Sequence, residues 1–110
     1  MRQFVIDELS PLEQDNLDSY LKRSLKPGPM VGIFWLVLPE DLYGDAQHGH
    51  QECGPFYFAV DLGKQRLSFE MLVRSAGNLH CTCIAWATKA QRQFVLEFID
   101  HMLDEERISA

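Results

Sequence analysis

The segment from Pro55 to Ser75 constrains the fold more than any other part of the chain. Its first half carries Phe56, Phe58 and Val60 at alternate positions, and turn-forming residues follow at 61–65. Alternation with a period of two indicates strands with one buried face, and a short turn between two such strands makes them pair antiparallel. The sequence therefore predicts a hairpin. In its second strand, the inward-facing side chains are Leu67, Phe69, Met71 and Val73.

Three further segments have the character of strands. Residues 3–8 alternate briefly around Phe4 and Ile6, and residues 79–87 are mostly small or apolar. Residues 31–38 are apolar on both alternating faces, with Phe34, Leu36 and Leu38 on one of them. A strand of this kind is covered on both sides, so it is expected to lie in the centre of its sheet or to face a partner.

Two helices are predicted from their capping signals. Ser10 and Glu13 form a capping box around Pro11, and apolar residues then recur at helical spacing until about residue 25. Thr88 and Gln91 form a second capping box, followed by an apolar stripe through residues 94–103. Both helices are expected to be amphipathic.

The order is thus strand, helix, strand, loop, three strands and a helix. Consecutive antiparallel strands with segregated helices indicate the α+β class. We expect a four- or five-stranded, mainly antiparallel sheet with both helices packed on one face, and a single domain over residues 1–110. At 110 residues the chain is large enough for one modest core and too small for two.

Charge and hydropathy exclude several classes of function. Sixteen acidic against ten basic residues give a net charge of -6, which argues against nucleic acid as a partner. The longest apolar run, residues 31–38, is far shorter than the roughly 20 residues of a membrane helix. The charged start of the chain is unlike a signal peptide, so a cytoplasmic location is expected. An odd number of cysteines, three, predicts thiols or ligands instead of a disulfide framework.

An apolar sheet face predicts self-association. If two helices cover one face, Phe34, Leu36 and Leu38 with Tyr57 would form an apolar patch on the other. Large exposed apolar patches are unusual in monomers, and pairing with a second copy is the common solution. We therefore expect a homodimer, or another protein partner, at these residues. The alternative is that the long loop at residues 39–55 folds over this face.

Histidines and cysteines gather in two stretches. His48, His50 and Cys53 lie in a glycine-rich loop, and Cys81 and Cys83 lie in the predicted last strand. Together they could supply the four tetrahedral nitrogen and sulfur ligands that zinc prefers. On a strand, residues 81 and 83 would share a face and His80 would point away. The alternative is that the cysteines are small packing residues, because free cysteine is often buried.

The leading interpretation is a small cytoplasmic interaction or regulatory module, homodimeric and without catalytic activity or cofactor. The first alternative is a zinc-binding protein that uses the loop from His48 to Cys53 together with Cys81 and Cys83. The second alternative is an enzyme with Cys53 as nucleophile and His50 as base, since the two lie three residues apart. Such spacing alone says little, so enzyme activity is the minority hypothesis.

Overall fold

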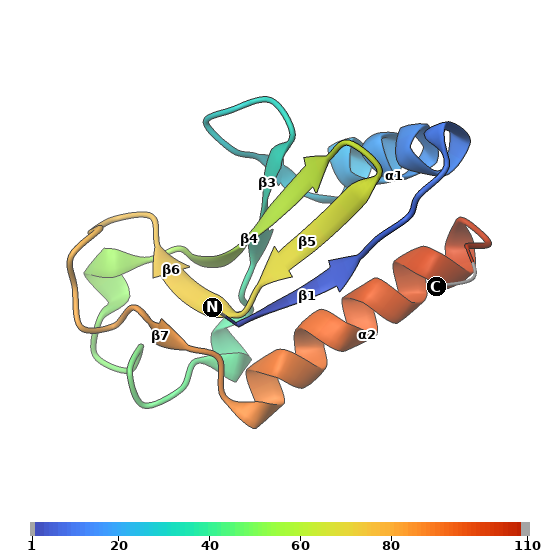
Figure 1. Ribbon diagram of the computed structural model, residues 1–110. Helices are drawn as coiled ribbons and strands as arrows, with labels where there is room; N and C mark the ends of the chain where they lie inside the picture. Colours follow the sequence, from blue (N-terminus) through green and yellow to red (C-terminus); the bar gives the residue numbers. More distant parts are fainter. Residues whose placement is uncertain (1, 109–110) are drawn as a thin grey trace.

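The computed structural model describes residues 2–108 and has the α+β architecture (Figure 1). Two helices and seven strands confirm the predicted class, with more strands than the four or five expected. The two additional strands are β2, which is only two residues long, and β6, which arises because the predicted return strand of the hairpin is divided in two. The elements are β1 (Gln3–Ile6), α1 (Pro11–Ser24), β2 (Lys26–Pro27), β3 (Ile33–Val37), η1 (Glu40–Leu42), η2 (Gln51–Cys53), β4 (Phe56–Gly63), β5 (Arg66–Glu70), β6 (Leu72–Ser75), β7 (Ala85–Trp86) and α2 (Lys89–Glu105).

The sheet is antiparallel throughout and has the strand order β1-β5-β4-β3-β2, with β6 on β4 and β7 on β6. The predicted hairpin forms between β4 and β5. Its return strand is interrupted at Met71: Val60 faces Phe69, whereas Phe56 faces Ser75. The return strand thus contains two more residues than its partner, which is a bulge that bends the strand and lets β6 turn toward β7.

Both helices begin at the predicted capping boxes. The Ser10 and Thr88 side chains accept hydrogen bonds from the backbone N–H of the third residue of their helices, Glu13 and Gln91. In turn, the Glu13 and Gln91 side chains accept hydrogen bonds from the backbone N–H groups of Ser10 and Thr88. These reciprocal bonds satisfy backbone N–H groups that the helix itself leaves unpaired. The capping pattern therefore located both helix starts.

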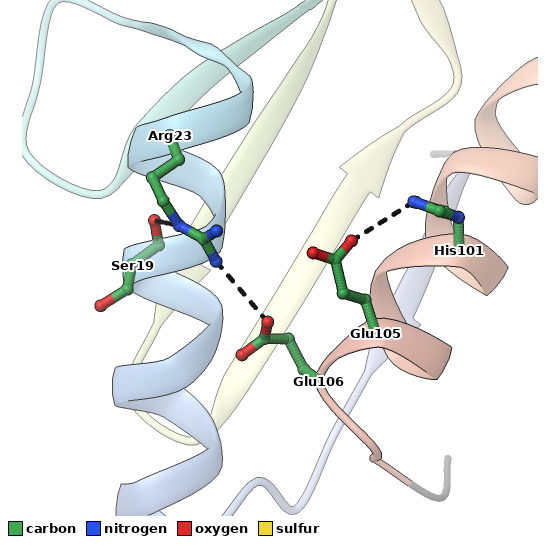
Figure 2. A network of polar contacts seen from close by, with 5 residues as sticks. All are labelled: Ser19, Arg23, His101, Glu105 and Glu106. Carbon is green, nitrogen blue, oxygen red and sulfur yellow. Dashed lines mark hydrogen bonds and ion pairs between the residues drawn. The ribbon is translucent and has the colours of Figure 1, made fainter.

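The two helices pack side by side on one face of the sheet, as predicted. Phe98 of α2 contacts both Tyr20 of α1 and Phe69 of β5, with ring centroids 6.1 Å apart in each pair. Figure 2 shows a polar contact between α1 and the end of α2, in which Arg23 of α1 lies 3.6 Å from the carboxylate of Glu106, the residue that follows α2. The core fills the space between this helical layer and the sheet.

The other face of the sheet is covered by neither described helix. Trp35 of β3 stacks on Tyr57 of β4 with centroids 4.1 Å apart, and Val37 beside them is 43% exposed. The two faces of β3 are therefore the reverse of those predicted. Phe34, Leu36 and Leu38 lie in the core under the helices, so their assignment to an uncovered face is wrong.

The predicted last strand is also much shorter than expected. Only Ala85 and Trp86 pair as a strand, and residues 79–83 form turns. Polar side chains near these turns bond to the backbone: Asn78 accepts a hydrogen bond from the His80 N–H at 3.0 Å. Such local bonds compete with strand pairing. No helix within residues 2–108 is long and apolar enough to cross a membrane.

Candidate metal centre

Two irregular segments meet at one end of the sheet. Residues 39–55 and 76–84, called the loop end below, appear in green and orange at the end of the molecule that carries β6 and β7 (Figure 1). Backbone hydrogen bonds join them: the Gly77 N–H donates to the Cys53 carbonyl and the Ala76 N–H donates to the Pro55 carbonyl, both at 3.0 Å. The two predicted ligand stretches therefore lie against each other.

Four of the five predicted ligands converge at this contact. His50, Cys53, Cys81 and Cys83 each offer one donor atom, and these four atoms lie within 4.8 Å of one another. Within the group, the Cys81 sulfur lies 3.1 Å from Nδ1 of His50. We call these four residues the His/Cys cluster. The cluster could hold a metal ion.

His48 lies outside the His/Cys cluster, although it is only two residues from His50. Its side chain is exposed, whereas that of His50 is half-buried. Gly49, between them, has a φ of +80°, a conformation that glycine adopts without strain and that redirects the loop. The sequence offered no means of choosing between the two histidines.

A tight turn presents Cys81 and Cys83. The Ile84 N–H donates to the Cys81 carbonyl at 3.2 Å, and the Cys83 N–H lies 3.5 Å from the Cys81 sulfur. The turn therefore wraps around one of its own sulfur atoms and directs an N–H group at it. A hydrogen bond of this kind stabilises a thiolate, which is the form that binds metals.

The pKa values of the thiols follow from these surroundings. The hydrogen bond from the Cys83 N–H lowers the pKa of Cys81 to about 6. Burial raises the pKa of Cys83 to about 12, and the hydrogen bond with Cys81 raises that of Cys53. In the absence of metal, Cys81 is thus the thiol of the group whose pKa most favours the thiolate near neutral pH.

Cys53 is held from the side of β6. The Ser75 hydroxyl, fully buried, donates to the Cys53 carbonyl and accepts a hydrogen bond from the Asn78 N–H at 2.9 Å. The backbone of Gly77 passes so close that a Cβ there would lie 2.7 Å from the Glu52 carbonyl oxygen. Only glycine lets the two segments approach this closely.

A buried glutamine, Gln47, holds the backbone at Cys83, and a second, Gln91, bonds to the first. The Gln47 amide donates to the Cys83 carbonyl at 2.8 Å and accepts from the Gly44 N–H at 3.0 Å. The Gln91 amide, at the start of α2, donates to the Gln47 oxygen at 3.1 Å. Gln47 and Gln91 are 2% and 1% exposed, so these hydrogen bonds are shielded from water.

The sequence does not predict that Ser75, Gln47 or Gln91 belongs to the site. Each is a polar residue of a common type in a segment that reads as strand, loop or helix, and nothing in the sequence reveals its burial. Their partners are backbone groups of the loops and of the ligand residues. They fix the backbone from which the ligands project, which is how outer-shell residues tune metal sites.

Comparison of the chain with protein families, with curated proteins and with solved structures found no match. The function must therefore be argued from the geometry of the site.

Proposed function

We propose that the chain is a small zinc-binding module in which the His/Cys cluster holds one zinc ion that ties the two segments of the loop end together. The observation that supports this proposal most strongly is the convergence of four nitrogen and sulfur donors from segments some 30 residues apart within 4.8 Å. Around zinc, donors of these types would lie about 3.5 to 3.8 Å from one another in a tetrahedron. Small shifts of the loops suffice, because the separation of the Cys81 sulfur and His50 Nδ1, now 3.1 Å, would lengthen slightly and the wider separations in the group, up to 4.8 Å, would shorten.

The donor set favours zinc over the other common metal ions. Three thiolates and one imidazole are soft and borderline ligands, which suit zinc, whereas magnesium and calcium require oxygen. The His/Cys cluster contains no carboxylate. Glu52, beside Cys53, is exposed.

The number of ligands favours a structural role over catalysis. Catalytic zinc sites keep a coordination position open for water or substrate, whereas structural sites are closed by four protein ligands. The His/Cys cluster supplies four. Its zinc would therefore act as a cross-link between the loops, which agrees with an interaction or regulatory module without catalysis.

Elemental mass spectrometry of untagged protein, purified without chelator, tests the proposal. We expect about one zinc per chain. His50→Ala should abolish stoichiometric zinc, whereas His48→Ala, a matched change two residues away at an exposed side chain, should retain it. Absence of zinc from the wild-type protein, or equal zinc in the two variants, would contradict the proposal.

A homodimer is a second candidate, and the stacked Trp35 and Tyr57 on the uncovered sheet face favour it. Charges of both signs surround the stack: Lys26 lies 5.7 Å from the Trp35 ring, and Arg74 bonds to Glu70 at 2.6 Å. A face of this kind can match a second copy of itself across a two-fold axis.

Light scattering tests the dimer. Val37→Asp places a charge beside the stack and should give a monomer, whereas Val31→Asp, at a fully exposed valine off the strands, should leave a dimer intact. A wild-type chain that is already monomeric at high concentration removes this candidate.

A further inference from the structure

A hollow of about 550 Å³ lies where β1, the bulge after β5 and the start of α2 meet. Its lining residues are Arg2, Gln3, Met71, Ala87 and Arg92, and we call it the arginine hollow. Backbone hydrogen bonds fix its walls, because the Met71 N–H donates to the Arg2 carbonyl at 3.0 Å and the Ala87 N–H donates to the Met71 carbonyl at 2.8 Å. The hollow is therefore built into the sheet and is separate from the His/Cys cluster.

Both arginine side chains are held in place. The Arg92 guanidinium donates to the Ala87 carbonyl at 2.9 Å, and the Arg2 guanidinium lies 5.4 Å from the centre of the Trp86 ring. A hydrogen bond to a carbonyl and a contact with an aromatic face position a guanidinium without neutralising it. Among residues 2–108, neither arginine forms an ion pair with a carboxylate.

The charge of the hollow is opposite to that of the chain. The protein carries a net charge of -6, yet two arginines and no acidic residue line this hollow. A second hollow, of about 360 Å³ at the β4–β5 turn, differs in that Asp61 accompanies its Lys64 and Arg66. Two unneutralised guanidinium groups beside the first turn of α2, where the helix dipole is positive, favour an anion.

We propose that the arginine hollow binds a small organic phosphate monoester, with Arg2 and Arg92 contacting the phosphate oxygens. A phosphate offers three terminal oxygens, so two guanidinium groups can each form a bidentate contact, whereas a carboxylate has oxygens for one such contact. The Gln3 amide adds a neutral donor. The buried Met71 and Ala87 provide an apolar floor for the organic part of the ligand.

Titration of the full-length protein with phenyl phosphate, followed by NMR, tests the proposal. We expect a saturable shift of the Trp86 indole N–H signal, because Trp86 contacts Arg2. Arg92→Gln should raise the dissociation constant about tenfold or more, as expected for loss of a charge-assisted contact. Arg66→Gln, which removes the same charge from the hollow that contains Asp61, should leave the dissociation constant unchanged.

Two further arms make the test decisive. Arg2→Gln should weaken binding as Arg92→Gln does, and it does so without a change in α2, which circular dichroism checks. Benzoate should bind at least about tenfold more weakly than phenyl phosphate, because it cannot engage both arginines. No saturable shift, equal weakening by Arg66→Gln, or benzoate binding as tight as phenyl phosphate would overturn the proposal. None of these readouts depends on zinc.

Discussion

The body of the protein and its loop end are stabilised in different ways. In the body, the sheet and both helices bury large apolar side chains, and Phe58, Phe69 and Val95 are fully buried. At the loop end, buried polar side chains bond to backbone groups, as Gln47 does to the Cys83 carbonyl and Ser75 to the Cys53 carbonyl. The first kind of contact is non-directional and proportional to area, whereas the second depends on geometry.

This difference implies that the two regions respond separately to change. Loss of an apolar side chain from the body should affect the stability of the whole domain. Loss of a ligand or of a polar contact at the loop end should affect metal binding first, and should leave the body folded. The following predictions test that separation.

The largest effect is expected in the body. Phe69→Ala removes a fully buried ring that packs on Phe98, and should lower the free energy of unfolding by about 3–5 kcal/mol. Phe4→Ala is the matched control, since Phe4 faces Phe69 across β1 and β5 but is 37% exposed. It should cost about 1–2 kcal/mol, because less apolar area is lost. Urea denaturation measures both, and equal losses would contradict the packing described here.

Metal removal should have the next largest effect. A ligand present at a hundredfold excess over its dissociation constant stabilises a fold by about 2.7 kcal/mol, which corresponds to roughly 10–20 °C in a domain of this size. Chelation should therefore lower the melting temperature by about that amount while the helical circular dichroism at 25 °C persists. An unchanged melting temperature would contradict a structural role of zinc. Loss of the helical signal would show that the body does not stay folded when the loop end loses its metal.

A smaller effect is expected from Gln47→Glu. Glutamate can still accept from the Gly44 N–H and from Gln91, but in its ionised form it cannot donate to the Cys83 carbonyl. We expect the affinity for zinc to fall about 10- to 100-fold, as for other outer-shell changes. Competition with a chromogenic chelator measures this affinity. Gln93→Glu, at an exposed position of α2, is the control and should bind zinc as the wild type does.

The smallest effect concerns the pH dependence of a single thiol. Because the pKa of Cys81 is lowered to about 6, its thiolate persists at pH 7 and is protonated as the pH falls below 6. Alkylation of Cys81 in metal-free protein should therefore slow about tenfold between pH 7 and pH 5. Peptide mass spectrometry after timed iodoacetamide treatment measures it. Faster reaction of Cys53 would contradict the arrangement of thiols and would favour the enzyme hypothesis.

The body could be predicted because its signals are local and repeated. Both capping boxes located helix starts, and alternation along residues 56–75 gave the hairpin. The orientation of β3 could not be predicted, since Ile33, Trp35 and Val37 are as apolar as the residues between them. A pattern that is apolar on both faces does not indicate which face the helices cover.

The loop end could be predicted in its residue types but not in its geometry. The ligands could be proposed because cysteine and histidine are distinctive in a sequence, and four of the five proposed do converge. Residues 79–83 form turns where the sequence predicts a strand, because their composition resembles that of a strand and a pattern does not show their local hydrogen bonds. The glutamines that support these turns contact residues about 36 and 44 positions away in sequence.

X-ray absorption at the zinc edge tests the central claim most directly, because it counts the sulfur and nitrogen neighbours of the bound ion. The protein as purified should show three sulfur neighbours at about 2.3 Å and one nitrogen neighbour at about 2.0 Å. His50→Ala should lose the bound zinc and with it this spectrum, and His48→Ala should reproduce the wild-type spectrum. A shell of only oxygen and nitrogen atoms would mean that zinc binds elsewhere, and would contradict the assignment of His50, Cys53, Cys81 and Cys83 as its ligands.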